Sequence, residues 1–170
     1  MVTRRSISIT LILALASLLV LLSASLATAR GGPKMLEFQT MVGVSGVFKG
    51  ADNAIRGVSG AGLAWTVASA KGEVTPAGHL ELKVTGLVFA EGPNTGSNTV
   101  TTFRALVSCL NSSAQPINLS TGPFPATTGA ASAGGGNAEV EADLAIPDPC
   151  IAPIVFVTSP GGAWFTVTGG

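Results

Sequence analysis

The feature that most constrains the fold of this chain is an alternating stretch at residues 79–90. Leu80, Leu82 and Val84 alternate there with charged or polar residues. Because successive side chains of a β-strand point to opposite faces, this pattern predicts a strand with one buried face and one solvated face. Gly86 interrupts the alternation, which indicates a bulge or a bend.

Similar stretches recur along the chain, separated by segments rich in Gly, Pro and Ser. The predicted strands are residues 35–41, 55–59, 63–70, 79–90, 100–110, 115–120, 137–146, 151–158 and 163–168. A tight turn is predicted at Lys71 and Gly72, and a hairpin turn at residues 159–162. No strand is followed by a segment of helical period, which argues against a parallel sheet. The sequence therefore predicts an all-β fold, an antiparallel two-sheet sandwich of about eight strands, with a small β-barrel as the alternative.

The N-terminus has the features of a secretory signal peptide. Arg4 and Arg5 form a positive segment, and an apolar run broken only by Ser and Thr follows at residues 7–22. The alternative is an uncleaved membrane anchor. That alternative is weaker, because the run is near the lower limit of about 17 residues for crossing a bilayer, and small residues rather than a charged cluster follow it.

A cleavage site is predicted directly before Arg30, because Ala27 and Ala29 place small residues at its −3 and −1 positions. We therefore expect residues 1–29 to be a signal peptide and residues 30–170 to form a single all-β domain. The expected destination is the extracellular space or the cell envelope.

The chain has two cysteines, Cys109 and Cys150, and both belong to the predicted mature domain. An even number of cysteines in an exported chain predicts a disulfide. Cys109 has the same strand parity as Phe103, Ala105 and Val107, so we expect it to face the core. The alternative is a pair of free, buried thiols.

The charge of the chain excludes some classes of partner. After signal removal it keeps seven of its nine basic residues and all nine acidic ones, a formal charge of −2. No basic run remains, which argues against nucleic acid or an anionic membrane surface as the partner. No membrane span is expected after cleavage.

The sequence has one histidine, His79, and its parity with Glu81 and Lys83 predicts that it faces solvent. A zinc site needs three or four ligands, and a Ser-His-Asp triad would have to use this one histidine. We therefore predict no catalytic, metal-binding or cofactor-binding residue, and no enzymatic activity.

Two alternative functions rest on particular residues. Glu139, Glu141 and Asp143 share one strand face and could serve a hydrolase, although such a pattern is typical of an ordinary solvated face. Trp65 and Trp164 could form the platform of a carbohydrate-binding module, although two tryptophans in strands are more typical of a core.

Several motifs of the mature chain occur together. They are Phe103-Arg104-Ala105, Val107-Ser108-Cys109, Thr121-Gly122-Pro123-Phe124-Pro125-Ala126, Pro149-Cys150-Ile151-Ala152-Pro153-Ile154-Val155-Phe156-Val157 and Trp164-Phe165, with a looser likeness at Ile55-Arg56-Gly57 and Trp65. In these motifs the chain resembles a family of uncharacterised secreted bacterial proteins that has no assigned activity. The resemblance implies a bacterial, exported, two-cysteine domain and carries over no catalytic residue.

The function expected from the sequence is that of an exported non-enzymatic domain, structural or partner-binding, with a protein or a glycan as the ligand. Loops on a rigid β-framework are common binding sites. The candidate binding surfaces are the loops at residues 91–98 and 121–136.

Overall fold

The computed structural model describes residues 32–168 of the chain. The predicted signal peptide and its cleavage site at Ala27, Ala29 and Arg30 lie outside the described residues. The regular elements of residues 32–168 are strands and two short 3-10 helices, η1 (Gly46–Phe48) and η2 (Ala131–Ala133), so the predicted all-β class is confirmed. No helix in this part of the chain is long and apolar enough to cross a membrane.

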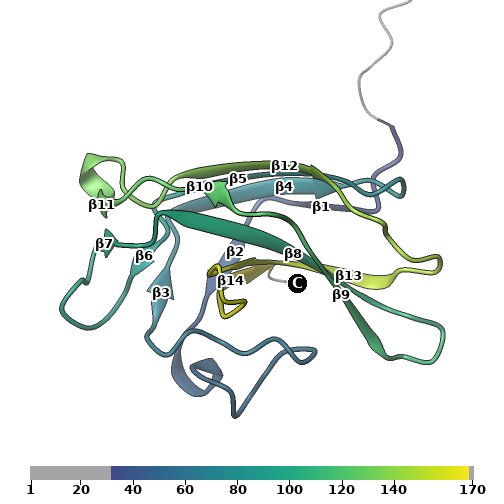
Figure 1. Cartoon of the computed structure of the whole chain (residues 1–170), viewed down its shortest axis with the longest axis horizontal. Coiled ribbons are helices and arrows are strands. Elements are labelled where there is room, and N and C mark those ends of the chain that lie inside the picture. The colour runs from purple at the N-terminus through teal and green to yellow at the C-terminus, as the bar shows by residue number, and fades with distance from the viewer. Residues whose placement is uncertain (1–31, 169–170) are drawn as a thin grey trace, which may run out of the picture. The chain divides into compact units, whose positions relative to one another are not determined.

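The strands form two larger antiparallel sheets and two short pairs (Figure 1). The four-stranded sheet has the order β1 (Leu36–Phe38), β4 (Ser69–Val74), β5 (His79–Thr85) and β12 (Ala138–Asp143). The six-stranded sheet has the order β10 (Phe124–Pro125), β8 (Thr102–Leu110), β13 (Ile151–Thr158), β14 (Trp164–Thr168) and β2 (Met41–Gly43), and β9 (Pro116–Ser120) also pairs with β8. The short pairs join β3 (Trp65–Thr66) to β6 (Val88–Phe89) and β7 (Ser97–Asn98) to β11 (Gly129–Ala130). Within the described residues neither larger sheet closes into a barrel.

The hydrophobic core draws on both larger sheets, and Figure 1 shows the four-stranded sheet layered over β8 and β13. The alternation predicted for β5 is confirmed, because Leu80, Leu82 and Val84 are at most 3% exposed. Gly86 lies between β5 and β6 with a φ of 63°, so the predicted break in the strand is also confirmed. Cys109 on β8 is fully buried, as its parity predicted.

A disulfide joins Cys109, near the end of β8, to Cys150, directly before β13, and no cysteine is free. The predicted disulfide is confirmed, and the alternative of two free thiols is wrong. The bond spans a sequence separation of 41 residues and connects two strands that are neighbours in the six-stranded sheet.

Three of the predicted strands are wrong in their extent. Residues 63–70 form β3 and the start of β4, which belong to different sheets. Residues 35–41 form two strands, β1 and β2, which belong to different sheets. Residues 55–59 form no named strand, and only an isolated bridge joins Ile55 to Val58. Residues 35–41 and 63–70 pass between sheets, whereas residues 55–59 lie in a connection that covers one sheet, so local hydrophobicity does not reveal these differences.

The tight turn predicted at Lys71 and Gly72 is also wrong, because both residues lie inside β4 and pair with β5. The actual turn ends at Gly78, whose N–H donates to the Thr75 carbonyl oxygen at 2.9 Å. A Cβ atom at Gly72 would lie 2.3 Å from the carbonyl oxygen of Glu81. This glycine therefore permits a close approach inside the sheet. The hairpin turn predicted at residues 159–162 is confirmed.

Residues 44–64 connect β2 to β3 and cover the side of the six-stranded sheet that faces away from the core (Figure 1). We call them the covering segment. The segment meets the sheet edge where the Trp164 N–H donates to the Ser59 carbonyl oxygen at 2.9 Å. The guanidinium of Arg56 donates to the carbonyl oxygens of Ser108 and Ala152 at 2.9 and 2.7 Å.

Candidate functional site

The outer face of the four-stranded sheet holds most of the acidic groups of the chain. We use the name outer face for the outward-pointing side chains of Glu37, Lys71, Glu73, His79, Glu81, Lys83, Glu139, Glu141 and Asp143. Six of the nine acidic residues of the chain belong to this set. The alternation of each strand places these side chains on the solvated side.

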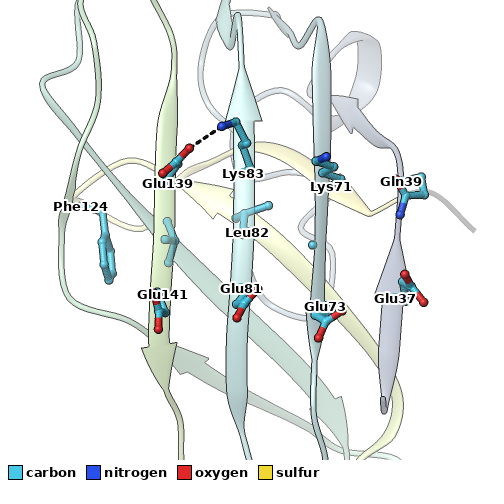
Figure 2. A pocket seen from close by; sticks show the side chains of 12 residues that line it. Glu37, Gln39, Lys71, Glu73, Glu81, Leu82, Lys83, Phe124, Glu139 and Glu141 are labelled. Carbon is cyan, nitrogen blue, oxygen red and sulfur yellow. Dashed lines mark hydrogen bonds and ion pairs between the residues drawn. The ribbon is translucent and has the colours of Figure 1, made fainter. Parts of the chain in front are cut away.

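A row of glutamates crosses this face at a right angle to the strands (Figure 2). The strand register pairs Glu37 with Glu73, Glu73 with Glu81, and Glu81 with Glu141. Adjacent members of the row are therefore about 4.8 Å apart in backbone spacing. Like charges directly opposite one another destabilise a sheet, so the row has an energetic cost to the fold.

A second row lies beside the glutamate row and is mostly basic (Figure 2). It pairs Lys71 with Lys83, and Lys83 with Glu139. The ion pair between Lys83 and Glu139 lowers the pKa of the Glu139 carboxyl, first through its hydrogen bond and then through charge attraction. Glu139 is therefore held as a carboxylate.

One end of the glutamate row is partly neutralised by Lys34. Its ammonium group lies 3.0 Å from a Glu37 oxygen and 2.7 Å from a Glu73 oxygen. These hydrogen bonds, with Glu73 as the larger contribution, raise the pKa of Lys34. At the other end of the row, Glu141 has no ion-pair partner among residues 32–168.

His79 lies at the rim of the outer face, on the solvated side that its parity predicted. Its Nδ1 is 2.9 Å from an Asp143 oxygen and its Nε2 is 3.3 Å from a Glu81 oxygen. The two carboxylates raise the pKa of His79, and the hydrogen bond to Asp143 is the largest cause. The imidazolium form therefore adds a positive charge beside the glutamate row.

An open hollow with a volume of about 600 Å³ lies over the outer face (Figure 2). Its lining includes both charged rows and the apolar groups Leu82, Val140 and Phe124. A second hollow of about 430 Å³ shares Lys83 and Glu139 with the first. The two hollows therefore adjoin each other on one sheet.

Neither tryptophan is available to stack on a sugar ring. Trp65 and Trp164 are 3% and 2% exposed. The ring of Trp65 stacks on Phe165 with centroids 4.0 Å apart, and the ring of Trp164 lies 6.1 Å from that of Phe156. The interpretation of both tryptophans as core residues is confirmed.

The three carboxylates considered for a hydrolase do share one face, as their alternation predicted. Glu139, Glu141 and Asp143 occupy successive outward positions of β12 and are all exposed. A catalytic acid needs a carboxyl group with a raised pKa, whereas the pKa of Glu139 is lowered. In the described part of the chain no group of three His, Cys, Asp or Glu residues is placed to hold a metal ion.

The two loops expected to carry binding surfaces are joined to each other. Strand β7 of residues 91–98 pairs with β11 of residues 121–136. Asn98 is 1% exposed, and its side-chain amide donates to the carbonyl oxygens of Val100 and Thr127 at 2.8 Å. These contacts use the polar groups of the loops for internal structure.

Comparisons with protein-family models, with curated protein sequences and with solved structures found no match to this chain. The membership of a secreted bacterial family that the motifs imply stays a prediction. The functional argument therefore rests on the geometry of the outer face.

Proposed function

We propose that this chain is an exported, non-enzymatic β-sandwich domain that binds a basic polypeptide segment on the outer face of its four-stranded sheet. The observation that carries the proposal is the glutamate row, which crosses an open hollow of about 600 Å³. The confirmed disulfide supports an oxidising destination outside the cytoplasm.

Charge complementarity identifies the partner class. Four carboxylates are held side by side, with Lys34 bound at one end of the row and the lysines of the second row beside it. Lysine or arginine side chains of a partner would relieve the repulsion among these carboxylates. Complementary charge also speeds association and selects between partners.

The environment of the row favours an extended or helical segment of protein over a small molecule. The hollow is open to solvent, whereas sites for small molecules bury most of the ligand. Phe124, which is half-buried in its lining, offers an apolar contact for the side-chain stem of lysine or arginine.

The proposal is tested by titrating the folded domain with an oligolysine peptide at low ionic strength. We expect Glu81→Gln combined with Glu141→Gln to weaken binding about fivefold, because each exposed ion pair contributes up to about 1 kcal/mol. Asp52→Asn combined with Asp148→Asn changes the net charge equally at exposed positions away from the outer face, and should leave the affinity within about twofold.

Two results would contradict the proposal. One is the absence of measurable binding to the unmodified domain. The other is an equal loss of affinity in both double variants, because that would show a response to net charge alone.

A further inference from the structure

A row of unpartnered hydrogen-bond donors lies in the six-stranded sheet. Arg104 on β8 is directly opposite Thr158 on β13, and Thr158 is opposite Trp164 on β14. Arg104 Nε, Thr158 Oγ1 and Trp164 Nε1 are buried and have no hydrogen-bond partner within residues 32–168. Three neighbouring residues on adjacent strands thus each have a buried polar atom without a hydrogen-bond partner.

The three side chains lie on the same face of the sheet. Directly opposed residues of neighbouring strands point to one side, which places Arg104 and Thr158 together. The pairing of β13 with β14 shifts register between Val157 and Thr158, so the side of Trp164 follows from its ring contact. The ring of Trp164 lies beside that of Phe156, which precedes Thr158 by two positions on β13 and therefore shares its face. This is the face covered by residues 44–64.

The chemistry of these groups specifies what they lack. The guanidinium and the indole can only donate hydrogen bonds, and a hydroxyl can donate as well as accept. Buried polar groups are almost always hydrogen-bonded, and a row of unpaired donors is unusual in a native fold. The missing component is an acceptor, and the charge of Arg104 favours an anionic one.

Thr158 and Trp164 are 1% and 2% exposed, whereas Arg104 is half-buried. Arg104 therefore provides the route from solvent into the row. Because Thr158 and Trp164 are almost fully buried, the ligand sought is a small one.

We propose that Arg104, Thr158 and Trp164 form a binding site for a small carboxylate anion. The carboxylate oxygens accept hydrogen bonds from the three donors, and the positive charge of Arg104 balances the anion. This site lies in the sheet opposite the outer face and does not depend on the binding of a basic partner there.

The probe is sodium formate, added to isotopically labelled protein while sodium chloride keeps the ionic strength constant. The chain has two tryptophans, so its indole N–H groups give two resolvable signals. We expect a saturable shift of the Trp164 signal. Thr158→Val and Arg104→Lys should each weaken formate binding about tenfold, because a hydrogen bond to a charged group is removed.

Thr166→Val is the matched control. Thr166 is fully buried in the same sheet, but its hydroxyl already donates to the Val42 carbonyl oxygen at 2.9 Å. Thr166→Val should keep formate affinity and unfold at a lower urea concentration. Thr158→Val without formate should unfold at the same concentration as the unmodified protein, or at a higher one, because the hydroxyl it removes has no partner.

The site is disproved if formate gives no saturable shift of either indole signal. It is also disproved if Thr158→Val and Thr166→Val change formate binding to the same extent. A marked loss of stability in Thr158→Val without formate would show that the hydroxyl is already paired, which also contradicts the proposal.

Discussion

The outward faces of the two larger sheets differ in their exposure to solvent. The four-stranded sheet exposes charged side chains to solvent, with Glu81 and Glu139 side chains 61% and 74% exposed. On the six-stranded sheet, Phe156 and Ser108 are fully buried because residues 44–64 cover that side. A sheet with one polar face can stay open, whereas a sheet that is apolar on both faces needs a cover from its own chain.

Backbone hydrogen bonds join the cover to β14, and Arg56 adds side-chain hydrogen bonds to two further strands. Its two hydrogen bonds reach β8 and the start of β13. Its own carbonyl oxygen accepts a hydrogen bond from the Asn118 side chain at 3.0 Å. Partial burial lowers the pKa of Arg56, although a guanidinium keeps its charge in proteins. We call these hydrogen bonds of Arg56 the latch, because they fix the covering segment to the six-stranded sheet. The open face has no segment to fix.

The largest effect is expected where the disulfide is removed from the covered sheet. Replacing both Cys109 and Cys150 by Ala should lower the free energy of unfolding by about 4 kcal/mol, because the unfolded chain regains the entropy of a long loop. Urea unfolding of the oxidised protein and the double variant measures this difference. Modification of two thiols by an alkylating reagent before reduction would contradict the bond itself.

A smaller loss is expected when the latch is removed. Arg56→Ala should lower the free energy of unfolding by about 2 kcal/mol, because two charge-assisted hydrogen bonds are lost. Hydrogen exchange should increase over residues 44–64. Arg56→Lys is the matched variant, since it keeps the charge but cannot reach both carbonyl oxygens with a planar fork.

Lys71→Ala on the open face is the control for the latch. Lys71 has no ion-pair partner in the described part of the chain, so its removal should change stability by less than about 0.5 kcal/mol. Equal effects of Arg56→Ala and Lys71→Ala would remove the distinction between the two faces.

The smallest effect concerns pH on the open face. The pKa of His79 is raised in the folded state, chiefly by Asp143. The stabilisation that this imidazolium gives is complete below its unfolded pKa of about 6.5 and is lost as the pH rises through the folded value. In Asp143→Asn, NMR titration should show the pKa of His79 moving down towards its ordinary value. An unchanged pKa would exclude Asp143 as the main cause.

The sequence predicts which face of a single strand is buried. It does not predict which strands pair with one another or in what register. The alternation of Leu80 and Leu82 with charged residues predicted the buried side of β5, and an even cysteine count predicted the disulfide. The glutamate row depends on register across four strands, to which residues 37 and 141 contribute from opposite edges. Register is set by tertiary pairing and turn geometry, so no local pattern revealed this row.

The errors have the same origin. Gly72 was interpreted as part of a turn, since glycine favours turns, yet it is needed where Phe38 and β5 approach closely. The role of residues 44–64 could not be read from their glycines, because a covering segment has no period of its own. Which sheet needs a cover becomes clear only when both faces of β8 and β13 are seen to be buried.

The position of the disulfide has a consequence for the opposite sheet. The chain between Cys109 and Cys150 leaves the six-stranded sheet, forms β12 at the edge of the four-stranded sheet, and returns. The bond therefore makes β12 part of a closed ring that both sheets share. Half of the carboxylates on the open face, those of Glu139, Glu141 and Asp143, belong to this ring. Reduction of the disulfide would open this ring and remove a constraint on β12, which carries these three carboxylates.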